Sequence, residues 1–213
     1  MIRKIAYIGF GDLGSQVSLF LKQAFPGDIN EVYFDDNLFS TQQQNSFPFS
    51  KYTDQQFDSY DFYICLGYKN LELKTKILSE MKTAGKKLPH FIHPSAIINP
   101  TAAIGDGVII YPGCNIDQHV ILEDGVLLNN SVTVSHNSII GKSSFLAPGV
   151  VISGNVKIGK ENFIGSATVV SNNTELGDNV ITGIGTVITK PVITGSSVIG
   201  NPMKILTEKI KLK

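Results

Sequence analysis

The sequence predicts two domains of different architecture: an α/β domain over residues 1–88 and a parallel β-helix of six-residue repeats over residues 89–213. Three observations predict them. A glycine-rich turn separates an apolar strand from an amphipathic helix near the N-terminus. Aliphatic residues recur every six positions from Ile92 onward. The composition also changes near residue 90, after which aromatic residues are rare and Gly, Val, Ile, Asn and Ser dominate.

Alternating strands and helices are expected in the first domain. KIAYIGFGDLGSQVSLFLKQ, which begins at Lys4, contains an apolar strand, a turn with three glycines and a helix with one apolar face. EVYFDD (31–36) and FYICLG (62–67) are rich in apolar and aromatic residues, which predicts two further strands. KNLELKTKILSEMKTAG (69–85) predicts a second helix that ends at Gly85.

The turn with Gly9, Gly11 and Gly14 joins a strand to a helix start, where free amides and the helix dipole favour a phosphate. Asp35 and Asp36 follow Gly14 by 21 and 22 residues and can accept hydrogen bonds from a ribose or a base. A dinucleotide needs two such halves, whereas only about ninety residues precede the repeat. We therefore expect one nucleotide diphosphate as ligand, with close packing of strand and helix as the alternative role of the glycines.

The second domain is a repeat with a period of six residues. An α-helix cannot use this period, because an apolar residue every six positions precesses around a 3.6-residue turn. Sixteen of the seventeen positions from Ile92 to Ile188 are aliphatic, and Thr182 is the exception. The positions are Ile92, Ile98, Ile104, Ile110, Ile116, Leu122, Leu128, Val134, Ile140, Leu146, Ile152, Ile158, Ile164, Val170, Leu176, Thr182 and Ile188.

Three such hexads make one coil of about 18 residues, and stacked coils bury the aliphatic positions in a continuous core. The corners need small residues or residues that tolerate positive φ. An ordinary β-sandwich with fortuitous spacing is the alternative, and the unbroken register argues against it. The residues expected at corners are Gly107, Gly113, Gly125, Gly149, Asn162 and Asn179.

Charge and hydropathy exclude several classes of function. The formal net charge is 0 and the isoelectric point is about 6.9, so a nucleic acid is not expected as partner. No apolar run approaches the roughly 20 residues that cross a bilayer, and the N-terminal residues do not form a signal peptide, so we expect a cytoplasmic protein. Cys65 and Cys114 lack metal or redox spacing and are expected to be buried free thiols.

The pattern [LIV]-G-x-x-[STAV]-x resembles the left-handed β-helix of the hexapeptide-repeat acyltransferases, which use acetyl-CoA or a related thioester and form homotrimers. A half-Rossmann (βαβαβ) domain before this helix resembles the sialic acid O-acetyltransferase (NeuD) and PglD-like sugar acyltransferases over essentially the whole chain. The resemblance implies an N-acetyltransferase that uses acetyl-CoA and a nucleotide-linked 4-amino-4,6-dideoxyhexose. Some members of the wider hexapeptide-repeat family bind a metal through several histidines. Only His119 and His136 fall inside the repeat proper here, with His93 at its start, so no resident metal is expected.

The resemblance also implies the site residues. His136, in SHNSIIG, corresponds to the family's catalytic base, and Asn137 replaces its usual acidic neighbour. Either the base is weaker here, or another acid such as Asp117 or Glu123 orients it. The remaining implied residues are Gly9, Gly11, Asp35, Asp36, Gly67 and Asn129 for the nucleotide sugar, and Gly200, Pro202 and Lys204 for the coenzyme. Gly154 stands 18 residues after His136, one full coil further along the same face, where its backbone amide is expected to polarise the thioester carbonyl of the coenzyme.

Other residues depart from the family pattern or have simpler roles. Phe145 stands where relatives carry a second histidine, and no arginine follows Gly67. His119 is a candidate for lining the groove, whereas His90 and His93 suit the entry to the β-helix and Lys190 suits a solvated surface. Transfer to a sugar hydroxyl and a non-catalytic trimer that binds a nucleotide sugar are the alternative functions. A hydroxyl is the poorer nucleophile, which favours an amine as acceptor.

Overall fold

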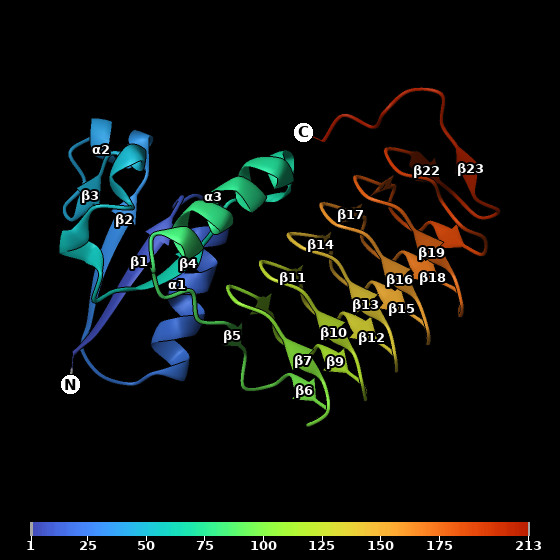
Figure 1. Ribbon diagram of the computed structural model, residues 1–213, viewed down its shortest axis with the longest axis horizontal. Coiled ribbons are helices and arrows are strands. Elements are labelled where there is room, and N and C mark those ends of the chain that lie inside the picture. Colours follow the sequence, from blue (N-terminus) through green and yellow to red (C-terminus); the bar gives the residue numbers. More distant parts are fainter. Residues whose placement is uncertain (1, 213) are drawn as a thin grey trace. The chain divides into compact units, whose positions relative to one another are not determined.

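The computed structural model describes residues 2–212, and the chain divides between Pro89 and His90 into two compact units (Figure 1). The first is a parallel α/β unit and the second a parallel β-helix of about six turns, so the predicted fold class is confirmed. Within residues 2–212, no helix combines the length and apolar character needed to span a bilayer.

A parallel sheet with strand order β3-β2-β1-β4 forms the centre of the first unit. Its strands are β1 (Arg3–Ile8), β2 (Ile29–Phe34), β3 (Ser46–Phe47) and β4 (Asp61–Ile64). The helices are α1 (Asp12–Ala24), α2 (Asp36–Ser40) and α3 (Leu71–Thr83), and single 3-10 turns span Phe49–Lys51, Gln55–Phe57 and Tyr68–Asn70. The order places β1 between β2 and β4, so the loops after all three strands reach one edge of the sheet.

Three boundaries differ from the sequence prediction. The second strand ends at Phe34, because Asp35 caps α2 by accepting hydrogen bonds from the Asn37 and Leu38 amides. The third strand covers Asp61–Ile64, and the second helix begins only at Leu71, where Asn70 is its N-cap. Strand β3 and helix α2 were not predicted, since both are short and β3 is defined by its pairing with β2.

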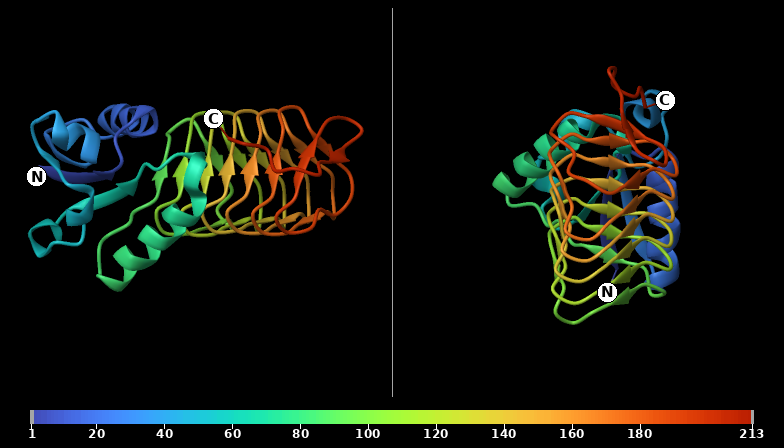
Figure 2. Two further views of the ribbon diagram at one scale, coloured as in Figure 1. Left: turned by 90° about the horizontal axis from the view of Figure 1, so that it is seen from above. Right: turned by 90° about the vertical axis from the view of Figure 1, so that its right-hand side faces the viewer.

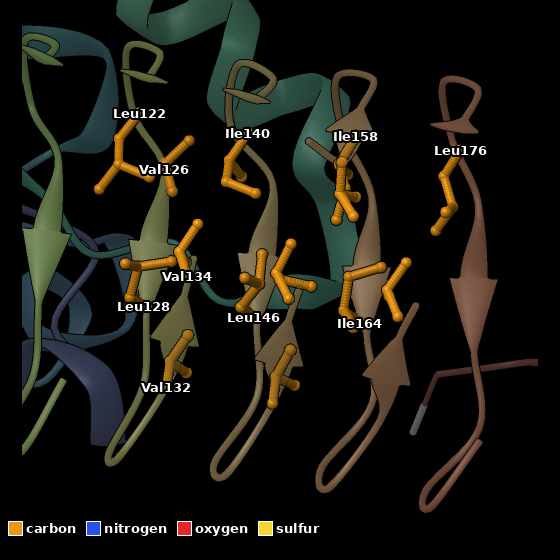
Figure 3. Packing of buried hydrophobic residues seen from close by; sticks show 14 of the residues in the cluster. Leu122, Val126, Leu128, Val132, Val134, Ile140, Leu146, Ile158, Ile164 and Leu176 are labelled. Atoms are coloured by element: carbon orange, nitrogen blue, oxygen red, sulfur yellow. The ribbon is translucent and has the colours of Figure 1, made fainter. Parts of the chain in front are cut away.

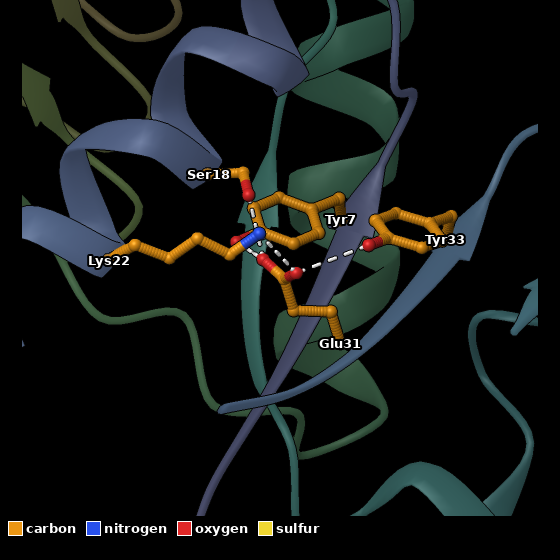
Figure 4. Close-up of polar contacts among 5 residues, drawn as sticks. All are labelled: Tyr7, Ser18, Lys22, Glu31 and Tyr33. Atoms are coloured by element: carbon orange, nitrogen blue, oxygen red, sulfur yellow. Dashed lines mark hydrogen bonds and ion pairs between the residues drawn. The ribbon is translucent and has the colours of Figure 1, made fainter. Parts of the chain in front are cut away.

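Glu31 of β2 ties helix α1 to the sheet (Figure 4). Its carboxylate accepts hydrogen bonds from the hydroxyls of Ser18 (2.7 Å), Tyr7 (2.8 Å) and Tyr33 (3.2 Å), and it pairs with Lys22 at 2.7 Å. Burial by itself raises the pKa of this carboxyl, but hydrogen bonds from Lys22, Ser18 and Tyr7 outweigh burial and hold the pKa below its ordinary value. Burial and the nearby Glu31 charge raise the pKa of Tyr33 to about 12, so this hydroxyl stays a donor.

The β-helix consists of two-residue strands, apart from the three-residue β22, in three sheets that form the sides of each coil and are parallel except for the last strand, β23 (Figure 2). The six-stranded sheet contains β6 (Ile97–Ile98), β9 (Asn115–Ile116), β12 (Thr133–Val134), β15 (Val151–Ile152), β18 (Val169–Val170) and β21 (Val187–Ile188). The five-stranded sheet contains β7 (Ala103–Ile104), β10 (Ile121–Leu122), β13 (Ile139–Ile140), β16 (Lys157–Ile158) and β19 (Glu175–Leu176). The eight-stranded sheet contains β5 (Phe91–Ile92), β8 (Ile109–Ile110), β11 (Leu127–Leu128), β14 (Phe145–Leu146), β17 (Phe163–Ile164), β20 (Ile181–Thr182), β22 (Ser197–Ile199) and an antiparallel β23 (Lys204–Ile205).

The predicted aliphatic positions form ladders inside the coils (Figure 3). Leu122, Ile140, Ile158 and Leu176 occupy equivalent positions in successive coils and are almost completely buried. Thr182, the exception in the register, is equally buried; its hydroxyl accepts a hydrogen bond from the Gly165 amide at 2.8 Å and pairs with the Thr168 hydroxyl at 3.0 Å. The interior therefore accepts a polar residue where both of its hydrogen-bonding functions have partners.

Every sixth residue from 107 to 185 has a positive φ, one at each corner of the coil. Five of the six predicted corner residues belong to this series, but Asn162 is wrong: its neighbour Glu161 has the φ of +58°. Asn162 points into the core, where its amide nitrogen donates to the carbonyls of Gly159 (2.7 Å) and Gly177 (3.0 Å). The corner series is Gly107, Gly113, His119, Gly125, Ser131, Asn137, Ser143, Gly149, Asn155, Glu161, Ala167, Asn173, Asn179 and Gly185.

We expect Glu31→Gln to destabilise the first unit by about 1–3 kcal/mol at neutral pH, because the charged acceptor of three hydroxyl donors is lost. The folded-state pKa of Glu31 is lowered, so its contribution to stability is complete above about pH 4.5 and disappears as the pH falls through the folded-state pKa. Hydrogen exchange of the α1 amides from pH 3 to 7 measures the difference. Glu72→Gln, at an exposed position of α3, controls for net charge, and a difference that persists at low pH would contradict the assignment.

Candidate active site

His136 and Asn137 lie at the corner between β12 and β13. We call this corner, taken over successive coils, the His136 edge; it comprises residues 117–120, 135–138, 153–156 and 171–174. Parallel pairing of β12 with β15 opposes Thr133 and Val151, a separation of 18 residues. Equivalent positions along the edge are therefore occupied by Gln118, His136, Gly154 and Asn172.

The half-buried imidazole of His136 lies directly against Gly154. A Cβ atom on Gly154 would stand 2.5 Å from Nε2 and 2.6 Å from Cε1 of the ring. Those separations are far shorter than van der Waals contact, so the His136 ring can keep this position only when residue 154 is glycine. The pairing of His136 with Gly154 expected from the 18-residue spacing is present in the structure.

Asn137 has two roles at this corner. Its φ is +57°, the conformation that His119, Asn155 and Asn173 adopt at equivalent positions of other coils, and asparagine tolerates it well. Its side-chain nitrogen Nδ2 also lies 3.1 Å from Nδ1 of His136. Asn137 thus provides both the bend of the chain and the polar contact that orients the ring.

The orientation of the Asn137 amide decides which ring nitrogen of His136 holds the proton. When Nδ2 faces the ring it donates to Nδ1, so the proton of the neutral imidazole lies on Nε2. When the amide turns by half a rotation, its oxygen accepts from Nδ1–H and Nε2 has a free lone pair. Only the second arrangement lets Nε2 act as a base.

Other carboxylates near this edge contact the backbone. Asp117 accepts a hydrogen bond from the Gln118 amide at 2.7 Å, and Glu123 accepts one from the Lys142 amide at 3.0 Å. The contact that the structure gives to Nδ1 of the His136 ring comes from Asn137 and not from either acid.

The Gly154 amide donates to Oδ1 of Asn172 at 2.8 Å. This bond lies on the side of Gly154 that faces the next coil, whereas the His136 ring approaches from the preceding coil. Asn172 was not predicted from the sequence. The signal was available, because the 18-residue step from His136 to Gly154 leads, when repeated, to Asn172.

In the first unit, Gly9, Gly11, Asp35, Asp36 and Gly67 all follow the carboxyl ends of β1, β2 and β4. Asp35 accepts from the Phe10 amide at 2.9 Å besides capping α2, and Asp36 accepts from the Phe49 amide at 2.8 Å. Both carboxylates therefore stabilise the conformation of these loops. The lone pairs that these hydrogen bonds leave free are the ones that can accept hydrogen bonds from a ligand.

Packing accounts for some of the predicted glycines and not for others. Gly9 has a φ of +79°, and a Cβ on Gly14 would be 2.8 Å from the Gly9 carbonyl oxygen. Gly11 and Gly67 have φ values of −76° and −72°, and a Cβ on either meets nothing within 4 Å. Packing therefore does not require glycine at either position, and the bare backbone at Gly11 and Gly67 leaves room for a ligand at this sheet edge.

The remaining predicted residues occupy other corners. Asn129 follows β11, at the corner between the eight-stranded and six-stranded sheets, so one chain does not bring it to the His136 edge. Gly200, with a φ of +85°, and Pro202 form the turn between β22 and β23, and Lys204 is exposed on β23. The Gly200 carbonyl accepts from the Val187 amide at the start of β21, three coils beyond β12.

Several further side chains now have defined surroundings. Phe145 is buried and stacks on Phe163 with ring centroids 5.7 Å apart. His119 is exposed and aligns with Asn137 rather than with His136. Cys65 and Cys114 are buried free thiols, as expected. Among residues 2–212, no group of three or more His, Cys, Asp or Glu side chains is placed to hold a metal ion.

The chain matches no protein-family model and no curated protein sequence. It is similar to the acetyltransferase domain of PglB from Neisseria gonorrhoeae, at 31% identity over 96% of this chain and 100% of that one, with a TM-score of 0.83. The structure of that domain in complex with acetyl coenzyme A gives 29% identity, coverage of 97% and 100%, and a TM-score of 0.84. PerB from Caulobacter crescentus, in complex with CoA and GDP-perosamine, shares the fold at 20% identity, coverage of 96% and 97%, and a TM-score of 0.75.

We expect Gly154→Ala to displace the His136 ring, because the new methyl group would occupy the position of Nε2 and Cε1. The substitution should therefore cost about 1 kcal/mol more in the wild-type background than in His136→Ala. Denaturant unfolding of the two single variants and the double variant gives this coupling energy. Equal costs in both backgrounds would show that the ring does not rest on Gly154.

Proposed function

The chain belongs to the hexapeptide-repeat sugar acetyltransferases, and we propose that it transfers the acetyl group of acetyl-CoA to the amine of a nucleotide-linked 4-amino-4,6-dideoxyhexose. The observation that carries this proposal is the His136 edge. It combines a solvent-accessible imidazole, a side chain that orients it and a backbone N–H one coil away.

His136 is the general base of the proposed reaction. The sugar nitrogen attacks the thioester carbonyl, so a C–N bond forms and the C–S bond breaks. His136 takes the proton from the nitrogen through Nε2 and delivers it to the departing thiolate. With its amide turned so that the oxygen accepts from Nδ1–H, Asn137 holds the ring and supplies orientation without a charge.

The Gly154 N–H is the proposed donor to the thioester oxygen as negative charge develops on it. This role requires that the Gly154 N–H can donate to a carbonyl oxygen. The side-chain oxygen of Asn172 already accepts such a hydrogen bond at 2.8 Å. The His136 ring rests on the same glycine, so the proposed base and the proposed donor belong to neighbouring coils of one edge.

The proposed coenzyme path runs along the β-helix from Gly154 toward the β22–β23 turn. Gly200 and Pro202 form that turn, two coils beyond β15 and Gly154. At about 4.8 Å per coil this is about 10 Å along the β-helix, which an extended pantetheine arm can cover. Lys204, exposed on β23, is the proposed partner of a coenzyme phosphate.

The nucleotide end of the acceptor is proposed to bind at the sheet edge of the first unit. Gly11 and Gly67 leave bare backbone there, and amides at the start of α1 suit a diphosphate. Lone pairs of Asp35 and Asp36 that the loops do not use are proposed to accept from the ribose or the base.

A homotrimer is the assembly that we propose for this chain. The outer face of the six-stranded sheet exposes aliphatic side chains, with Ile97 68% exposed and Val151 and Val169 each 36% exposed. Asn129 and His136 lie at different corners of one chain, so a single acceptor could touch both only where two copies meet.

Transfer to a hydroxyl is the second candidate. A hydroxyl must lose its proton earlier in the attack than a neutral amine does, and so it needs a stronger base. An imidazole beside a neutral amide, rather than beside a carboxylate, favours the amine.

We expect His136→Ala to lower kcat/KM about a hundredfold or more, because the base is removed. Asn137→Asp should move the acidic limb of the pH–rate profile to higher pH, since a carboxylate beside the ring stabilises the imidazolium and raises its pKa. Asn137→Gly keeps the positive φ of the corner and serves as the control for loss of the amide alone.

The assay uses acetyl-CoA with UDP-, dTDP- and GDP-linked 4-amino-4,6-dideoxyhexoses, each compared with its 4-hydroxy counterpart. Near-wild-type turnover by His136→Ala would overturn the mechanism. Faster transfer to the 4-hydroxy sugars than to the amines would support the second candidate instead.

We also expect Gly67→Val to raise KM for the nucleotide sugar about tenfold or more, because the new side chain fills space that is open in the free protein. KM for acetyl-CoA and the thermal midpoint should stay near their wild-type values, since the φ of −72° suits any residue. Steady-state kinetics with each substrate varied in turn provides the test. An unchanged KM for the sugar would place the nucleotide elsewhere.

A further inference from the structure

Asn172 occupies the position one coil beyond Gly154 along the His136 edge. Its side-chain oxygen accepts the Gly154 N–H at 2.8 Å. Gly154 therefore has the His136 ring on one side and the Asn172 amide on the other. The proposed function gives the same N–H to the thioester oxygen, and one N–H cannot make two full hydrogen bonds at once.

We propose that Asn172 is a positioning residue for the acyl group. In the free enzyme the side-chain oxygen of Asn172 accepts a hydrogen bond from the Gly154 N–H and occupies the position that the thioester oxygen takes in the complex. Acetyl-CoA displaces the Asn172 side chain when it binds. Both oxygens are neutral carbonyl acceptors, so the same N–H direction suits either one. The inference rests on the proposed function of the Gly154 amide.

The Asn172 contact differs in charge from comparable contacts at another corner of the coil. Asp124 accepts the Asp106 N–H and Asp178 accepts the Lys160 N–H, both at 2.9 Å and across the same 18 residues. Those acceptors are carboxylates, whereas the Asn172 side chain is a neutral amide. A hydrogen bond to a neutral acceptor is weaker than one to a carboxylate. The bond at Gly154 is thus the one of these three that a ligand can most easily replace.

The occupied N–H also affects the free protein. With Asn172 in place, the amide that will meet the acyl oxygen is held in a fixed direction beside the His136 ring. Preorganised donors need no rearrangement at the moment of reaction, which is what makes them effective. Displacement of the Asn172 side chain is the movement that this proposal requires.

Binding of acetyl-CoA and of CoA by calorimetry tests the proposal without a sugar substrate. CoA lacks the acyl oxygen and does not compete with Asn172. We expect Asn172→Ala to lower Kd for acetyl-CoA about three- to tenfold, because the competing acceptor is gone, and to leave Kd for CoA unchanged. Asn172→Asp should raise the ratio of Kd for acetyl-CoA to Kd for CoA about tenfold, because a charged acceptor holds the N–H more firmly.

Asp178→Ala is the matched control, since it removes an equivalent contact at Lys160 and should leave both Kd values unchanged. If the ratio of the two Kd values is the same in wild type, Asn172→Ala and Asn172→Asp, the proposal is overturned and Asn172 only supports the coil. A wild-type protein that binds neither acetyl-CoA nor CoA would overturn the proposed function as well. A wild-type protein that binds both, with an inactive His136→Ala and an unchanged ratio, would overturn the role of Asn172 alone.

Discussion

Hydrogen-bonded stacking of each coil on the next, at a separation of 18 residues, is the constraint on which the C-terminal unit depends. Because the coils pair in parallel along three sheets, equivalent positions lie one strand spacing apart, about 4.8 Å. A side chain at a corner therefore contacts the equivalent corner position of a neighbouring coil. The His136 ring on Gly154 and the Gly154 amide on Asn172 are two consequences of this spacing.

The same constraint explains the composition of the corners. Each corner needs one residue with positive φ, and the chain supplies it with glycine, asparagine or another residue every six positions. Asn137 is one of these corner residues, so it has a structural role that is independent of any role in the reaction. A carboxylate at this position would give the ring a charged partner, whereas asparagine satisfies the backbone and leaves the ring with a neutral one. Backbone geometry and the strength of the base are thus coupled through one residue.

The first unit depends on a different interaction, the carboxylate of Glu31 between α1 and the sheet. This carboxylate accepts three hydroxyl donors and one ammonium group, so helix α1 is held against β1 and β2 by a polar cluster as well as by apolar packing. The loops after the strands are held separately, with Asp35 bonded to the Phe10 amide. Glycines that the backbone or the packing requires, Gly9 and Gly14, are distinct from those that remain open, Gly11 and Gly67.

The sequence by itself determined the two folds, the six-residue register and the stacking of His136 on Gly154, because a strict period leaves one way to bury the aliphatic residues. It did not predict β3 and α2, whose short segments depend on pairing with β2 and on the Asp35 cap. Asn162 was misplaced because it was assigned to a corner by residue type, whereas the six-residue register of the other five predicted corners places this corner at Glu161. Only the tertiary structure decided that the Asn172 side chain takes the Gly154 N–H, because the period fixes the path of the backbone and not the direction of a side chain.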